Sequence, residues 1–258
     1  MVNLINTTIE DTPDGAIALI TIDNQRKANT LNSAAIGDLN RSLSELHSNP
    51  DIALVILTGA GDKVFIGGAD IKEMSTLNTE SARTFITNLH HVCHKIRYLH
   101  APVIARVNGL ALGAGMEIAA VCDMVVACQH AAFAMPEVRV GIPSVIDAAL
   151  LPRILGAGLA RDLVMTGRML SAADARVAGF VQRLAEETTL DEEIQTVIDE
   201  ILAGGRQAIS LQKQLCNDWE NNPLASGIQI GIETFAHSYD TAEPKTMMER
   251  FLNRDRSG

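Results

Sequence analysis

A run of six apolar residues, Ile52-Ala-Leu-Val-Ile-Leu57, constrains the fold more than any other segment. It ends at Thr58-Gly-Ala-Gly61, and a short strand without polar alternation needs cover on both faces, as in a sheet layered by helices. The strand-like segment Ala16–Ile22 and a helical pattern over residues 36–46 precede it. The order β, α, β predicts an α/β fold.

The alternation is renewed in the middle of the chain. A helical pattern over residues 85–99 leads into a predicted strand at Pro102–Val107 and a Gly-rich turn at Asn108–Gly113. A short helix over Ala114–Val121 and a strand over Asp123–Ala127 should follow.

The chain changes character at Asp147. Helical patterns occupy residues 148–156, 158–166, 190–202 and 207–219, and no further strand is predicted. Because no Pro- or Ser-rich linker separates the halves, these helices should pack on the same core or on another copy of the chain. An oligomer is therefore expected.

Composition excludes several classes of function. A net charge of −10 and 3% aromatic residues argue against a nucleic-acid partner. The longest uncharged stretch, Met124–Pro136, is too short to cross a membrane, and no signal peptide is recognised. The four cysteines form no C-x-x-C pair, which favours a reducing cytoplasm.

Common catalytic and metal motifs are missing. Thr58-Gly-Ala-Gly-Asp-Lys63 lacks phosphate-loop spacing, and there is no G-x-S-x-G elbow. His90 and His94, with Cys93 nearby, would share a helix face, but no third distant ligand is evident. Surface or boundary histidines explain the pattern better, so no metal site is predicted.

Two Gly-rich turns each present a backbone donor. In Phe65-Ile-Gly-Gly-Ala-Asp-Ile71, Asp70 and Glu73 have capping-box spacing, which leaves the Ala69 N–H at a turn. In Asn108–Glu117 a helix starts near Ala114, whose N–H is an unpaired donor at the positive helix end.

Glu117 lies one turn after Ala114, so a carboxylate and a free N–H face the same place. A reaction that forms an oxyanion beside a proton acceptor needs this arrangement. Taken alone, either turn is better explained by close packing and by compensation of the helix dipole.

A second carboxylate follows in Phe133-Ala-Met-Pro-Glu137. Pro136 should end a strand and place Glu137 at its tip. If Glu117 and Glu137 face each other across an apolar pocket, burial and repulsion would separate their pKa values, so that one acts as a base while the other holds a proton.

Together these motifs resemble the crotonase (enoyl-CoA hydratase/isomerase) superfamily over nearly the whole chain. The segments that carry the resemblance are Lys27-Ala-Asn-Thr-Leu-Asn32, Phe65–Ile71, Asn108–Glu117, Cys122-Asp123, Phe133–Glu137, Leu163–Arg168 and Ser171–Val181. The resemblance implies a spiral of ββα units over residues 1–195 and a C-terminal helical trimerisation region over 196–258 in the same structural unit. It further implies a homotrimer or a hexamer built as a dimer of trimers.

The resemblance also implies the chemistry. The N–H groups of Ala69 and Ala114 would bind the thioester carbonyl of an acyl-CoA. Glu117 would take a proton from water that attacks C3 of a 2-enoyl-CoA, and Glu137 would supply the proton at C2. Because hydratases of the superfamily use two glutamates, the pair favours hydration. No cofactor is implied, since coenzyme A arrives as part of the substrate.

The implied coenzyme A contacts fall on two loops and two cations. Lys27 and Ala28 would hold the nucleotide end together with the backbone at Ile66 and Gly67. Lys72 and Arg254 are candidate phosphate partners, Arg254 from a neighbouring subunit. Solvated surface cations are the alternative for these two side chains.

One segment departs from the hydratase pattern. Where glycines usually follow Gly141-Ile-Pro143, this chain has Ser144-Val-Ile-Asp-Ala-Ala-Leu-Leu-Pro152, which predicts a stiffer, bulkier acyl pocket for a short or unusual acyl chain. The alternatives are a crotonase-fold isomerase with one proton-shuttling glutamate and a non-catalytic scaffold that binds coenzyme A or RNA.

Overall fold

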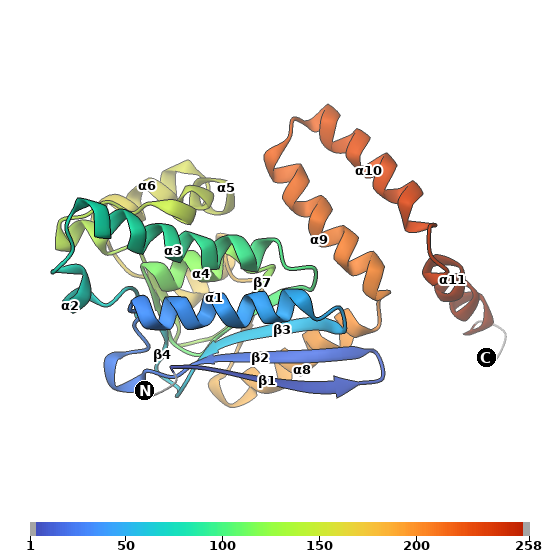
Figure 1. Ribbon diagram of the computed structural model, residues 1–258, viewed down its shortest axis with the longest axis horizontal. Helices are drawn as coiled ribbons and strands as arrows, with labels where there is room; N and C mark the ends of the chain where they lie inside the picture. Colours follow the sequence, from blue (N-terminus) through green and yellow to red (C-terminus); the bar gives the residue numbers. More distant parts are fainter. Residues whose placement is uncertain (1–3, 255–258) are drawn as a thin grey trace.

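Two sheets frame the fold of the computed structural model, which describes residues 4–254 (Figure 1). The larger sheet has the order β1-β2-β3-β5-β7-β10, with β1 and β2 antiparallel and the other neighbours parallel. Its strands are β1 (Ile5–Thr12), β2 (Gly15–Ile22), β3 (Ile52–Gly59), β5 (Val103–Val107), β7 (Met124–Cys128) and β10 (Arg183–Ala185).

A smaller sheet has the order β4-β6-β8-β9, and β4, β6 and β8 are parallel. Its strands are β4 (Val64–Ile66), β6 (Leu110–Leu112), β8 (Ala132–Ala134) and β9 (Leu170–Ser171). Three times in succession, therefore, the chain runs through one strand of the larger sheet and then one of the smaller sheet. This repeated crossing is the ββα spiral that the resemblance implied.

The predicted strands of the core are confirmed. Every residue of β3 is buried, as the unbroken apolar run required, because β2 and β5 flank it and helices cover it. The helices α1 (Ser33–Ser48) and α3 (Thr79–Arg97) pack against each other and lie on one side of the larger sheet, as Figure 1 shows. The short helices α2 (Ile71–Met74) and α4 (Ala114–Val121) follow β4 and β6.

The second half is helical, with two corrections. The short strands β9 and β10 occur where no strand was predicted, since two or three residues are too few to show an alternating pattern. The helices are α5 (Leu151–Leu155), α6 (Ala157–Thr166), α7 (Ala172–Val177), α8 (Leu190–Leu202), α9 (Arg206–Asn221), α10 (Leu224–Ser238) and α11 (Glu243–Arg254). Short 3-10 turns lie at Gln25–Lys27, Glu137–Val140, Ile146–Leu150 and Glu187–Thr189.

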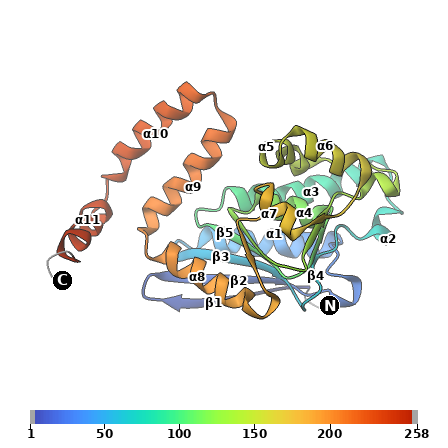
Figure 2. The ribbon, with the colours of Figure 1, turned by 180° about the vertical axis from the view of Figure 1, so that it is seen from behind.

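Helices α9 to α11 form an arm that extends from the two-sheet body (Figures 1 and 2). Its attachment includes the buried Lys213 of α9, whose ammonium group lies 2.8 Å from the Asp123 carboxylate and also donates to the carbonyls of Ile96 and Ala101. The division proposed at residue 195 falls within α8, one loop before the arm begins.

Candidate active site

A pocket of about 210 Å³ lies where the parallel strands of the smaller sheet end. Ala69 and Ala114 line it, and so do Glu117 and Glu137. The structure therefore brings together the four groups that the sequence placed on three separate segments. The remaining wall is mainly apolar and includes Ile71, Met74, Phe85, Ile86, Leu89, Leu112, Val140, Ile142 and Val145.

The Ala69 N–H lies in the turn between β4 and α2. Its neighbours are bonded to Leu31, which donates to the Gly68 carbonyl and accepts from the Asp70 N–H, both at 2.9 Å. Ala69 itself forms only a bridge to Leu31, and no acceptor for its N–H occurs among residues 4–254. This donor is available to a ligand.

The capping-box prediction for α2 is half right. Asp70 accepts from the N–H groups of Lys72 and Glu73, as a helix cap should. The Glu73 carboxylate, however, does not return to Asp70; it accepts from the Ser33 N–H at 2.9 Å and from the Ser33 hydroxyl. Glu73 therefore ties α2 to the start of α1.

The second donor, the Ala114 N–H, belongs to the first residue of α4. The preceding N–H, of Gly113, donates to the Ala134 carbonyl at 2.8 Å, and the described residues offer Ala114 no acceptor of its own. The turn at Gly68 lies against the end of β6, since a Cβ at Gly68 would be 3.1 Å from the Leu112 carbonyl oxygen. Two donors from adjacent turns therefore flank one pocket.

Glu117 is buried in the first turn of α4, with 4% of its surface exposed. Burial raises its pKa to about 8, and the nearby carboxylates of Glu137 and Asp147 add to the rise. The Ala148 N–H opposes it by donating to Glu117 Oε1 at 3.0 Å. Near neutral pH Glu117 is thus a carboxyl that can hold or release a proton.

Glu137 begins the 3-10 turn that follows β8, at the strand tip where the sequence placed it. It is half-buried, and its Oε2 accepts a hydrogen bond of 2.7 Å from the Ser144 hydroxyl. Its other oxygen lies against Gly113. The carboxylate is therefore held between the start of α4 and the segment that follows Pro143.

The loops proposed for coenzyme A lie side by side. The Gly67 N–H donates to the Ala28 carbonyl at 2.9 Å, which joins the loop at Lys27 and Ala28 to the end of β4 at Ile66. Asn29 fastens the same loop, because its buried amide donates to the carbonyls of Ala60 and Val64.

The cations proposed for the phosphates differ in their surroundings. Lys27 is exposed but lies 3.1 Å from Asp70, so it already has a carboxylate partner. Lys72 is exposed at the start of α2. The side chain of Arg254 lies outside the described residues.

Sequence reasoning missed how the departing segment holds the pocket. Ser144 contacts Glu137, Ala148 contacts Glu117, and Asp147 lies 2.9 Å from His90 of α3. Ile146 has a φ of 40°, a left-handed conformation that is rare for a β-branched residue. The only signal in the sequence was the loss of glycines, which said nothing about these partners.

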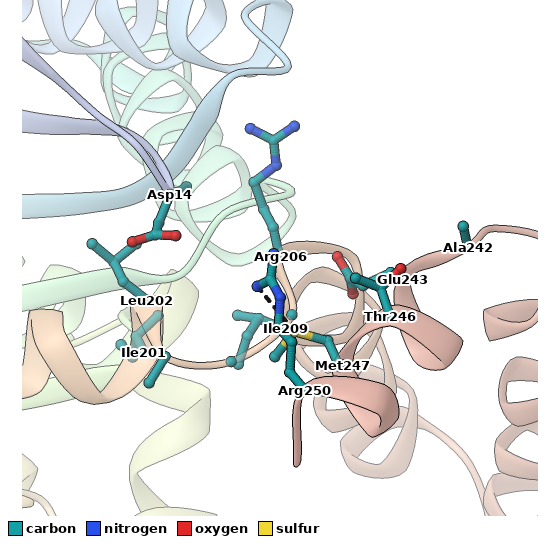
Figure 3. Close-up of a pocket in the computed structure, with 14 residues that line it drawn as sticks. Asp14, Ile201, Leu202, Arg206, Ile209, Ala242, Glu243, Thr246, Met247 and Arg250 are labelled. Carbon is teal, nitrogen blue, oxygen red and sulfur yellow. Dashed lines mark hydrogen bonds between the residues drawn. The ribbon is translucent and has the colours of Figure 1, made fainter. Parts of the chain in front are cut away.

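Other groups and hollows offer weaker chemistry. A cleft between the start of α9 and α11, drawn in Figure 3, contains Arg206, Glu243 and Arg250. There Glu243 accepts from the N–H groups of Gln207 and Ala208, so it caps α9. Within residues 4–254 we find no cluster of acidic, cysteine and histidine side chains arranged for a metal, and no helix long and apolar enough to cross a bilayer.

The chain alternates between two sheets in repeated ββα units and ends in a helical arm, and this arrangement defines a crotonase fold. The chain belongs to the enoyl-CoA hydratase/isomerase family, which it matches over residues 12–257. It is 33% identical over 242 residues to the short-chain-enoyl-CoA hydratase of Clostridium acetobutylicum, with 93% of each chain covered. It is 32% identical to the crotonyl-CoA hydratase of Syntrophomonas wolfei, with 92% of each chain covered.

Solved structures agree with this assignment. The crystal structure of an enoyl-CoA hydratase from Bacillus anthracis superimposes with a TM-score of 0.92 at 29% identity, over 97% of this chain and 96% of the other. That of an enoyl-CoA hydratase from Mycobacterium smegmatis gives 0.91 at 28% identity, over 96% of each chain.

Proposed function

We propose that this chain is an enoyl-CoA hydratase that adds water across the 2,3 double bond of a short 2-enoyl-CoA. One observation carries the proposal: two carboxyl groups and two backbone N–H groups that have no acceptor among the described residues line the same largely apolar pocket. Relatives named as short-chain-enoyl-CoA hydratase and crotonyl-CoA hydratase support the choice of reaction.

In this mechanism the thioester oxygen accepts hydrogen bonds from the N–H groups of Ala69 and Ala114. Electron density moves from the double bond towards that oxygen as water attacks C3, so the donors stabilise the enolate that forms. One donor of this kind is typically worth about 3 kcal/mol of transition-state stabilisation.

The two glutamates divide the proton transfers. Ionised Glu117 takes a proton from the attacking water, and Glu137 gives a proton to C2, so that the product is a 3-hydroxyacyl-CoA. Because burial raises the pKa of Glu117 to about 8, its ionised form is a stronger base than an exposed carboxylate. Protons return to their starting positions through solvent after product release.

The acyl group should be short and apolar. The cavity of about 210 Å³ has to accept the reacting end of the thioester as well as the acyl chain. Val140 and Ile142 add branched side chains to the pocket wall, and Val145 adds another from the segment that departs from the hydratase pattern.

The decisive experiment is an assay over a panel of short 2-enoyl- and 3-enoyl-CoA thioesters. Loss of the conjugated enoyl absorbance, with ¹⁸O from labelled water in the product, is the result expected for hydration. Conversion of a 3-enoyl-CoA to a 2-enoyl-CoA without ¹⁸O would establish the isomerase instead. Binding of CoA esters without turnover would leave the scaffold alternative.

We propose coenzyme A contacts at the joined loops, through the backbone of Ala28, Ile66 and Gly67, with Lys27 and Lys72 near the phosphates. Since Lys27 shares Asp70 with the cap of α2, a phosphate would have to compete with that carboxylate. Arg254 is kept as a phosphate partner from a neighbouring subunit.

The arm supports assembly into a homotrimer or a hexamer of two trimers. On α10, Leu224, Ile228, Ile232 and Phe235 each expose more than half of their surface to solvent. Together with Trp219 they line an apolar hollow between α9 and α10. Burial of such a patch against another copy would remove it from water, and a subunit mass from light scattering tests the number of copies.

A cytoplasmic location is proposed because none of the four cysteines is in a disulfide and two of them, Cys93 and Cys128, are buried in the core.

A further inference from the structure

Both glutamates of the pocket are held by one short stretch of chain. The Ser144 hydroxyl donates to Glu137 at 2.7 Å, and the Ala148 N–H donates to Glu117 at 3.0 Å. The distance between the two carboxyl groups thus depends on where residues 144–150 lie. We call this stretch the holding segment.

The holding segment has a strained backbone, and Ile146, Ala148 and Leu150 pack it against the core. Ile146 has a φ of 40°, which is unfavourable for a non-glycine residue and persists only when the surroundings impose it. Val145 and Ala149 are exposed. The 3-10 turn over Ile146–Leu150 has no side-chain cap. Something outside the segment has to fix its position.

Asp147 supplies a polar connection, in addition to the packing of the turn on α4 and α3. It is buried, with 8% of its surface exposed, and its Oδ2 lies 2.9 Å from Nδ1 of His90 on α3. The turn and α3 pack against each other, so the pair joins the holding segment to a 19-residue helix. Its position in the chain is between Ser144 and Ala148, the two residues that contact the glutamates.

We propose that the pair formed by Asp147 and His90 is a positioning clamp, which fixes the holding segment so that Ser144 and Ala148 keep Glu137 and Glu117 in their reacting positions. The inference rests on the proposed hydratase function. Neither residue of the clamp lines the pocket, so both act through the segment and not on the substrate.

The surroundings of the pair favour positioning over other roles. From α3, Cys93 and His94 lie within electrostatic reach of Asp147, and from α4 so does Glu117. Cys93 is fully buried, and its thiol pKa is raised well above its ordinary value, mainly by that burial, so it is not a nucleophile here. On α3, Asp147 is held by the hydrogen bond to His90 and, beside it, by a hydrogen bond with the Cys93 thiol.

The test compares two substitutions at one site. Asp147→Ala removes the hydrogen bond, whereas Asp147→Asn keeps an oxygen that can accept from His90 Nδ1. We expect Asp147→Ala to lower kcat at least 10-fold with KM for the enoyl-CoA changed less than 3-fold. Asp147→Asn should keep kcat within 3-fold of the parent. His90→Ala should also lower kcat, though no further than Asp147→Ala, and the double variant should be no worse than Asp147→Ala.

His91→Ala is the matched control, because His91 is the exposed neighbour on the same helix. Melting temperature and CoA-ester binding are measured on every variant, and kcat is expressed per folded molecule. If Asp147→Ala does not fold, His90→Ala and Asp147→Asn still decide the matter. Wild-type kcat in His90→Ala, or an equal loss in Asp147→Asn and Asp147→Ala, would overturn the clamp.

Failure of the proposed function looks different. If the parent protein shows no hydration of any thioester in the panel, the hydratase proposal fails before the clamp is tested. An active parent with indifferent clamp variants refutes only the clamp.

Discussion

Glu137 and Gly113 fit together so closely that a side chain at position 113 would displace the carboxylate of Glu137. A Cβ there would come within 3.0 Å of Glu137 Oε1, nearer than real Cβ atoms approach. Gly113 also has a φ of 52° and precedes Ala114, the residue with the free N–H. One glycine thus leaves space for a proposed acid and sets the direction of a proposed donor.

Gly113→Ala should therefore abolish most activity. The new methyl group displaces Glu137 and the backbone loses its preferred conformation, so kcat should fall at least ~100-fold, the loss of a proton-transfer group. Gly156→Ala is the control: it has a φ of 76° but open space around its Cβ. Both substitutions should lower the melting temperature, but only Gly113→Ala should lower kcat per folded molecule. Equal activity in the two variants would contradict the assignment.

Glu117→Gln and Glu137→Gln should each lower kcat by at least ~100-fold, in the range of general acid–base contributions, while CoA esters still bind. Steady-state kinetics with an equilibrium binding measurement separates the two effects. Glu73→Gln serves as the control, since this carboxylate contacts Ser33 and does not line the pocket. Near-normal hydration by either pocket variant would refute the two-glutamate mechanism.

The raised pKa of Glu117 predicts the pH dependence. If ionised Glu117 is the base, kcat/KM should rise with pH through about 8, where Glu117 loses its proton, because that profile reports the free enzyme. The measurement is a kcat/KM profile from pH 5.5 to 9.5. A fall through pH 8 would exchange the roles and make Glu117 the proton donor.

Ala114→Pro removes the proposed donor at a position where helices accept proline. Catalysis should fall ~10²–10³-fold, corresponding to ~2.7–4 kcal/mol of transition-state stabilisation, with a small change in melting temperature. A melting curve and kcat on the same preparation check this. A stability loss with kcat within a few-fold of the parent would mean that the turn serves packing alone.

Lys213→Met should loosen the attachment of the arm. Removal of one partner from a fully buried ion pair costs about 3–5 kcal/mol, and the 26% exposure of the Asp123 side chain reduces this to about 2 kcal/mol. Chemical denaturation measures the loss. Adding Asp123→Asn should restore part of it by removing the unpaired carboxylate, and Lys245→Met, an exposed cation on α11, should have little effect. An unchanged free energy of unfolding would remove Lys213 from the attachment.

Local patterns predicted much of this fold. The apolar run of β3 and the periodic stripe of α8 were visible because buried strands and amphipathic helices leave a regular trace in neighbouring residues. The strand β1 was not predicted. Six of its eight residues are exposed and only one is buried, so its sequence has no alternating apolar pattern.

Contacts between distant segments were not predictable in this way. Asp147 and His90 are 57 residues apart, and neither stands in a motif that names the other. Lys27 matched a coenzyme A loop, yet its partnership with Asp70 depends on how two turns fold together. The positions of the backbone donors could be predicted from the sequence, because the first N–H groups of every helix lack a partner within the helix. Side-chain partners, in contrast, depend on tertiary packing.

The parallel order of β4, β6 and β8 has a consequence for how such a protein can change over evolution. Ala69, Ala114 and Glu137 each follow one of these three neighbouring strands, so the ~4.8 Å between paired strands sets the scale of their separation. This spacing is set by main-chain hydrogen bonds between the strands, and it does not depend on the side chains that line the pocket around the acyl chain. Substitutions at Ile71, Met74 or Val140 can therefore change which acyl group fits the pocket while Ala69, Ala114 and Glu137 keep their positions. The substrate specificity of such a protein can thus evolve separately from its reaction.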